Sequence, residues 1–241
     1  MHATKLRLFA VLVVTTVLCS SCLYSRMLSF KSQLASFDKY VSLVDNGSTL
    51  EFKKPVVRPD DITDLTGFPP SLVQMQTNSQ QIHAYRYVSL SPVESTGTPT
   101  VLCFTMTYGS GGLKAFHNPS LVTEVLGTNL VVAAARAIGE SSFNAKEYRL
   151  DWSTQSTNLQ TTCIPSLKKM ILVLGVPLTH SNTPAGIFAG YRFNLEGTNG
   201  ILRTNGFMNA EFIFDKRNTL LRKGAIHIGK LKLILELPAV P

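Results

Sequence analysis

Apolar and polar side chains alternate at every second position in several segments, and this spacing predicts β-strands, mostly in the second half of the chain. In the last segment, Leu231, Leu233, Leu235 and Leu237 predict one continuous apolar face. Ile226 and Ile228 fall on the opposite face if that segment is a single strand. Turns rich in glycine and asparagine separate the candidates. The expected strands are Ile82–Leu90, Thr100–Tyr108, Met170–Val176, Gly186–Asn194, Phe207–Phe214 and Ala225–Leu237.

A spacing of three and four residues predicts a helix over Ser25–Val44. We interpret it as a helix that packs on its own domain, and a stalk or interfacial helix near a membrane is the alternative. Its last part, Tyr40–Val44, can instead begin a strand, because Asn46-Gly47 is a tight-turn signal. The apolar face consists of Met27, Phe30, Leu34, Phe37, Val41 and Val44.

Proline and acidic residues mark the beginnings of further helices. Pro59-Asp60-Asp61 begins a short helix that ends at Gly67, since proline fits the first turn and carboxylates suit its positive end. Asn118-Pro119 begins another that runs to Gly127, and a further helix follows as far as Gly139. Helices and strands are therefore mixed early and strands follow alone. This order predicts an α+β fold with N-terminal helices and a mostly antiparallel, curved sheet in the C-terminal half.

The first residues have the layout of a secretory signal peptide. Lys5 and Arg7 give a basic start without acids, and Leu8–Leu18 is an uncharged run of 11 residues. As a helix this run is about 16 Å long, which is short for a permanent membrane span. The uncharged stretch continues to Ser25, so an uncleaved N-terminal anchor is the alternative.

The stretch Leu18-Cys19-Ser20-Ser21-Cys22 resembles the lipobox of bacterial lipoproteins. The resemblance implies that residues 1–21 are removed and that Cys22 becomes the first residue and carries a diacylglycerol. It departs from the usual pattern at Cys19, where leucine is common. By the same resemblance, the non-acidic Leu23 favours the outer membrane, facing the periplasm. An ordinary cleaved signal peptide is the alternative.

These patterns divide the chain into three parts. We expect a signal peptide over residues 1–21, a lipid-attachment residue and amphipathic helix over 22–45, and a single α+β domain over 46–241. Hydrophobic residues make up 44% of the 241 residues and charged residues 16%, which is enough apolar material for a core.

The charge balance is basic, at +8, and becomes +6 once Lys5 and Arg7 are removed with the leader. A positive charge favours anionic envelope components, and a merely solvated surface is the alternative that we prefer because no dense basic run occurs. No nucleic-acid motif is recognisable and export argues against such a partner. The basic pairs are Lys53-Lys54, Lys168-Lys169, Lys216-Arg217 and Arg222-Lys223.

Two cysteines, Cys103 and Cys163, remain in the body of the protein. In an oxidising compartment they suit one disulfide bridge. Cys103 lies in an apolar run, so a buried free thiol is an equal alternative.

One glycine-rich segment, Tyr108–Lys114, follows a predicted strand and contains a serine and a lysine that could take part in chemistry. Its spacing fits neither the Gly-x-Ser-x-Gly elbow of hydrolases nor a phosphate-binding loop, so we interpret it as a turn. A weaker alternative is an anion-binding nest formed by Gly109, Ser110, Gly111 and Gly112 with Lys114. The histidines His83, His117, His180 and His227 lack metal-ligand spacing, and no metal or cofactor is expected.

Three functions follow in order of preference. The first is an exported, lipid-anchored envelope protein with a binding or scaffolding role and an unidentified protein partner. The second is a carrier of an apolar ligand, held in a curved-sheet cavity among Phe207, Phe212, Ile226 and Leu233. The third is a periplasmic hydrolase that uses Ser110. Because no catalytic spacing is found, an enzyme is not favoured.

Overall fold

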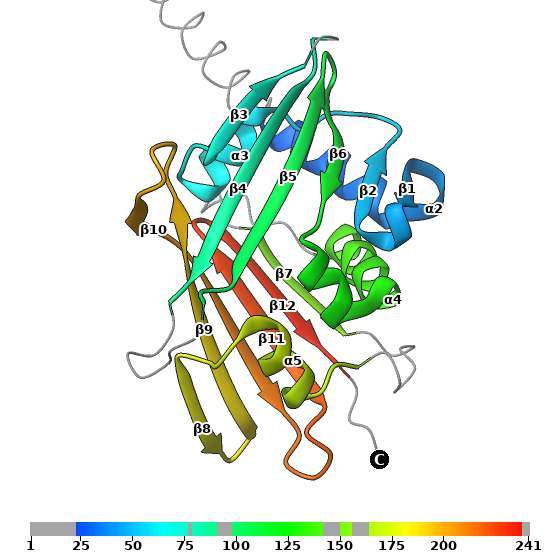
Figure 1. The fold of residues 1–241 in the computed structure, drawn as a ribbon. Helices are drawn as coiled ribbons and strands as arrows, with labels where there is room; N and C mark the ends of the chain where they lie inside the picture. The colour runs from blue at the N-terminus through cyan, green and yellow to red at the C-terminus, as the bar shows by residue number, and fades with distance from the viewer. Residues whose placement is uncertain (1–22, 77–78, 91–97, 142–149, 156–163, 238–241) are drawn as a thin grey trace, which may run out of the picture.

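A twelve-stranded sheet connects the two halves of the chain in this computed structural model (Figure 1). The structure describes residues 23–76, 79–90, 98–141, 150–155 and 164–237. The strand order is β1-β2-β6-β5-β4-β9-β10-β11-β12-β7, with β3 paired to β4 and β8 to β9. The halves meet where β4 pairs with β9, through Tyr87 and Leu195. All pairs are antiparallel except β12 with β7.

The α+β class predicted from the sequence is therefore confirmed, and the sheet also takes in the early strands. The strands are β1 (Val41–Val44), β2 (Thr49–Phe52), β3 (Leu72–Met75), β4 (Gln81–Ser89), β5 (Val101–Gly109), β6 (Gly112–His117), β7 (Leu150–Gln155), β8 (Thr179–Thr183), β9 (Gly186–Glu196), β10 (Leu202–Phe214), β11 (Leu221–Ile228) and β12 (Leu231–Glu236).

Several helices lie where the sequence predicts them. Residues 23–35 are helical, and the strand alternative for the following segment is confirmed because β1 begins at Val41. The predicted break near Gly127 is also confirmed, since this glycine has φ 69° and ψ 157° inside the helical segment. The remaining helices are α2 (Phe37–Tyr40), α3 (Pro59–Thr66), α4 (Ser120–Glu140) and α5 (Leu167–Leu174), with a 3-10 turn η1 at Asp45–Gly47.

The prediction of a strand over Met170–Val176 is wrong, because this segment lies in helix α5 and the turn after it. Ser166 caps the helix by accepting a hydrogen bond from the Lys169 N–H at 3.3 Å. Met170, Val173 and Leu174 are buried on one helical face. A short apolar run fits a buried strand and a buried helix equally well, so spacing did not separate them.

The prediction of one strand over Ala225–Leu237 is also wrong. A turn at Gly229, with φ 54°, divides the segment into β11 and β12. Ile226 and Leu233 consequently lie opposite each other in the antiparallel pair, on the same face of the sheet. The turn reverses the chain, so residues whose numbers differ by an odd number can lie on the same face of the sheet. In one continuous strand they would lie on opposite faces.

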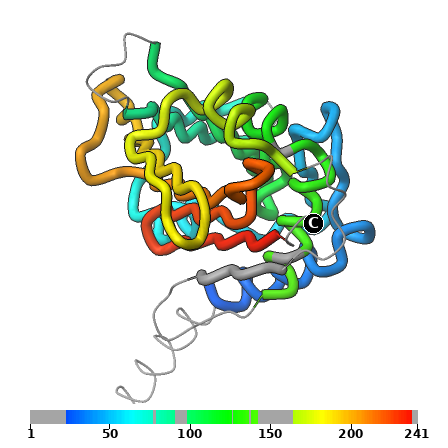
Figure 2. The backbone as a smooth tube through the Cα atoms, turned by 90° about the horizontal axis from the view of Figure 1, so that it is seen from below, coloured from blue at the N-terminus to red at the C-terminus, as the bar shows by residue number. Residues whose placement is uncertain are grey.

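The sheet is strongly curved, and α5 lies across from β11 and β12 when the molecule is seen from below (Figure 2). The main apolar cluster combines Phe193 of β9, Phe214 of β10, Leu130 of α4 and Met170 of α5. All four side chains are almost completely buried. The helices α4 and α5 therefore pack against the same side of the sheet and complete this core.

Candidate functional site

The residue after Cys22 already belongs to a helix that packs on the rest of the protein. Cys22 lies outside the described residues, but Leu23 is helical and half-buried. Met27 and Leu34 are buried in a second apolar cluster with Leu65 and Ala135. Any group attached at position 22 would therefore be joined to the folded body without an unstructured linker. No helix in the described part of the chain combines the length and the hydropathy that a membrane span requires.

A buried ion pair holds this helix on α3. Arg26 donates to both carboxylate oxygens of Asp61, at 2.8 and 2.6 Å, and the Asp61 side chain is only 2% exposed. Asp61 also accepts a hydrogen bond from the Arg58 N–H at 2.8 Å. The sequence pattern explained Asp61 by helix capping alone. The structure adds a charge partner 35 residues away in sequence, which no local pattern indicates.

The glycine-rich segment forms the turn between β5 and β6, as predicted. The Ser110 side chain is exposed and makes no hydrogen bond to any described residue, so no observed contact supports Ser110 as a nucleophile. Gly112 lies against the backbone of Val56 and Val57, and the Leu113 N–H donates to the Val57 carbonyl at 2.7 Å. That N–H is consequently occupied, and the anion nest of Gly109–Gly112 with Lys114 stays a prediction.

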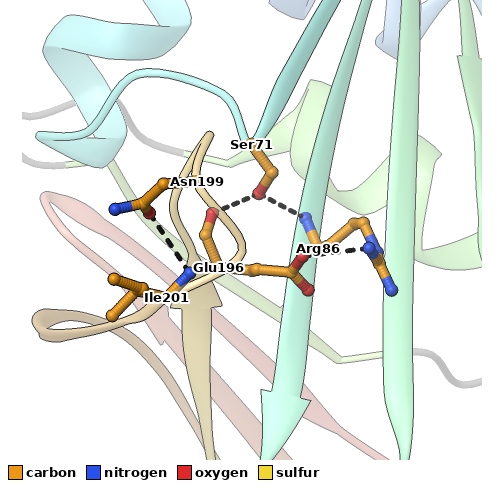
Figure 3. Close-up of polar contacts among 5 residues, drawn as sticks. All are labelled: Ser71, Arg86, Glu196, Asn199 and Ile201. Carbon is orange, nitrogen blue, oxygen red and sulfur yellow. Dashed lines mark hydrogen bonds and ion pairs between the residues drawn. The ribbon is translucent and has the colours of Figure 1, made fainter.

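A second set of polar contacts lies where β4 changes its pairing partner from β3 to β9 (Figure 3). The Ser71 hydroxyl donates to the Glu196 carbonyl at 2.5 Å and accepts from the Arg86 N–H at 3.0 Å. Arg86 also pairs with the Glu196 carboxylate at 3.0 Å. In the adjoining loop, the Ile201 N–H donates to Asn199 Oδ1 at 3.2 Å. These bonds satisfy backbone groups at a fork in the sheet, so we assign them a structural role.

Only one of the two body cysteines, Cys103, lies among the described residues. Cys103 lies half-buried on β5, with its sulfur 3.9 Å from Thr105 Oγ1, and forms no disulfide with another described residue. Cys163 lies outside the described residues, so the predicted bridge between them stays a prediction.

The histidines lie in separate environments. His83 is buried against Tyr108 in a T-shaped contact, and burial lowers the pKa of its imidazole. His117 lies between two hydroxyls, with Nδ1 2.9 Å from Thr49 and Nε2 3.3 Å from Thr107. His180 is exposed on β8 and His227 is half-buried on β11. No three metal-ligating side chains cluster anywhere in the described segments.

The four residues proposed to surround an apolar ligand do not share one face. Phe212 lies on the concave face with Ile226 and Leu233, as their register shows. Phe207 has the opposite phase on β10 and packs beneath the Arg192 guanidinium, 4.0 Å from its ring centre. Including Phe207 was wrong because the strand alternates and positions 207 and 212 differ by an odd number.

Three of the four basic pairs gather at one end of the molecule, the lower end in Figure 1. Lys168-Lys169 begins α5, Lys216-Arg217 lies in the turn between β10 and β11, and Arg222-Lys223 follows in β11. Backbone hydrogen bonds tie α5 to that turn, from Leu167 N–H to the Thr219 carbonyl and from Leu221 N–H to the Pro165 carbonyl, both at 2.9 Å.

The pairs at this end differ in their counterions. Arg222 lies 3.8 Å from Asp215, and Lys223 lies 2.7 Å from Glu236. Lys168, Lys169, Lys216 and Arg217 are exposed and make no ion pair within the described part of the chain. The folded chain thus brings together four cations that form no ion pair with a described residue and that the sequence distributes over 50 positions.

Comparison of the chain with family models, curated proteins and solved structures gave no match.

Proposed function

We propose that this protein is exported and held at the cell envelope by a lipid on Cys22, at the outer membrane facing the periplasm, where it has a binding or scaffolding role. The leader pattern supports export and acylation. The observation that carries the proposal is that Leu23, the residue after Cys22, already lies in a helix that Arg26 and Asp61 join to the folded body.

The physics of the anchor suits this arrangement. Each buried methylene of an acyl chain contributes about 0.8 kcal/mol, and two or more chains hold a protein stably on a bilayer. Because Leu23 is already helical, the residues next to position 22 would face the lipid surface. Tyr24 and Leu28 are exposed there and lie one helical turn apart, about 40% exposed each, which suits contact with the headgroup region.

Metabolic labelling with radioactive palmitate tests the anchor. We expect the wild-type chain to take up label and Cys22→Ser to take up none, because the thioether needs this thiol. Cys19→Ser is the matched control, since it removes a cysteine three positions earlier and leaves the proposed attachment residue. A wild-type chain that stays unlabelled while a control lipoprotein is labelled contradicts the proposal.

A second candidate function is the transport of an apolar ligand along the concave face of the sheet. One observation favours it: the Tyr191 hydroxyl is buried on that face and has no hydrogen-bond partner among the described residues. Burial raises the pKa of Tyr191 to about 12, so the group stays a neutral hydrogen-bond donor at physiological pH. Such a donor inside an apolar surface suits the polar end of a fatty ligand.

Filling the concave face tests this carrier hypothesis. Ala189 is completely buried beside Tyr191 and Phe212 in the main cluster. In a carrier, Ala189→Phe should remove the binding of a fluorescent fatty acid and leave the unfolding midpoint nearly unchanged. In a solid core the same substitution should cost about 2 kcal/mol of unfolding free energy. Phe207→Ala, on the other face, is the control that should retain binding.

A further inference from the structure

We propose that the end of the molecule containing α5 binds an anionic lipid surface. Lys168, Lys169, Lys216 and Arg217 would contact lipid phosphates, while Leu172 and Val176 enter the headgroup region. This inference names a partner for the binding role proposed above and rests on that role, but it does not need acylation of Cys22.

The charge at this end is the first observation. The four cations come from two segments that backbone hydrogen bonds hold together, at Leu167 with Thr219 and Leu221 with Pro165. None of the four has a carboxylate partner among the residues described. An anionic surface attracts such a cluster because each cation exchanges bulk counterions for fixed phosphates.

The exposed apolar side chains are the second observation, and they favour a bilayer over a soluble acidic polymer. Leu172 is 82% exposed and Val176 is 57% exposed. Leu172 lies three and four positions after Lys169 and Lys168, so all three share the outer face of α5. A soluble polyanion would pair with the lysines and leave Leu172 in water. A lipid surface accepts both kinds of group, because the basic heads stay at the phosphates while the apolar chains go deeper.

The position of this surface is the third observation. The helix over residues 23–35 runs behind the strands in the upper half of Figure 1, whereas α5 and the turn between β10 and β11 lie at the lower end. A protein held in one membrane through its N-terminus therefore presents the basic and apolar end away from that membrane. This arrangement suits a bridge between two lipid surfaces.

Vesicle clustering tests the inference with the full chain. The protein is incorporated into phosphatidylcholine vesicles and mixed with acceptor vesicles that either contain phosphatidylglycerol or lack it. We expect clustering only with the anionic acceptors, weaker at high salt. Lys168→Gln with Lys169→Gln should reduce it about tenfold, and Leu172→Ser should also reduce it about tenfold.

Two control variants remove the same kinds of side chain, a pair of lysines and an exposed apolar residue, from other parts of the surface. Lys53→Gln with Lys54→Gln removes two charges, and Met75→Ser removes a side chain that is 66% exposed on β3. Both should cluster vesicles as the wild type does. Because Leu172 is almost fully exposed, its replacement should leave the circular dichroism spectrum and unfolding midpoint unchanged.

The remaining outcomes are decisive. If the anionic acceptors do not cluster, the inference is wrong. If the lysine variants abolish clustering while Leu172→Ser has no effect, the partner is a polyanion of any kind and the lipid assignment fails. Flotation of the donor vesicles reports anchoring separately. A chain that does not float with them contradicts the proposed anchor, and its direct sedimentation with phosphatidylglycerol vesicles then still tests the inference.

Discussion

Asp61→Ala is expected to lower the free energy of unfolding by about 3 kcal/mol, because it leaves Arg26 partly buried without its carboxylate. The Asp61 side chain is 2% exposed and that of Arg26 is 20% exposed, so water compensates the lost charge poorly. The Arg58 N–H also loses its acceptor. Urea denaturation followed by circular dichroism measures the change.

The exposed pair of Asp38 and Arg136 provides the matched control. Its atoms approach to 2.8 Å, but the side chains are 84% and 46% exposed. Asp38→Ala should therefore cost less than about 1 kcal/mol. If both alanine variants had equally small effects, the buried pair would not hold the N-terminal helix on α3.

Gly139→Ala is expected to lower the free energy of unfolding by about 3 kcal/mol, because two backbones meet at this glycine. A Cβ at Gly139 would overlap the backbone of Ala35 at the end of the N-terminal helix. The backbone atoms cannot rotate away as a flexible side chain would, so α4 and the N-terminal helix must separate. Differential scanning calorimetry should show a lower midpoint for the variant.

Gly67→Ala separates steric overlap from conformational strain. Gly67 has φ 80°, and a Cβ there would meet no heavy atom within 4 Å. The left-handed backbone alone should cost about 1 kcal/mol. An equal loss in both variants would contradict the close approach at Gly139.

In the proposed anchored protein, Asp61→Ala and Gly139→Ala both loosen the helix next to Cys22 and so make the tether flexible.

The elements that the sequence predicted well carry their signals within a few residues. Pro59 and Gly67 bound α3 because proline fits the first helical turn and glycine accepts the left-handed conformation that ends a helix. Gly127 interrupts α4 for a similar reason. The strands β4 and β5 coincide with the predicted segments Ile82–Leu90 and Thr100–Tyr108, where apolar side chains recur at every second position.

The two wrong predictions concern segments whose local pattern fits two different structures. Met170–Val176 is apolar throughout, and only its packing on the concave face showed that its buried side chains follow a helical spacing. In the last hairpin, Gly229 can adopt φ 54°, and its turn lies against α3, where the Lys230 N–H donates to the Leu65 carbonyl at 2.8 Å. That contact joins residues 165 positions apart, so no neighbouring residue indicates it.

The sequence by itself determined the α+β class, the approximate bounds of α3, β4, β5 and β9, and the leader pattern that supports the proposed anchor, because each depends on spacing or turn chemistry between near neighbours. Tertiary structure alone decided the pairing of β4 with β9, the burial of Asp61 against Arg26, and the gathering of Lys168-Lys169 with Lys216-Arg217 beside Leu172. These features join segments that are distant in the chain. Their contacts form only when the sheet curves and α5 packs against its concave face. The spacing of residues along the chain contains no measure of these distances.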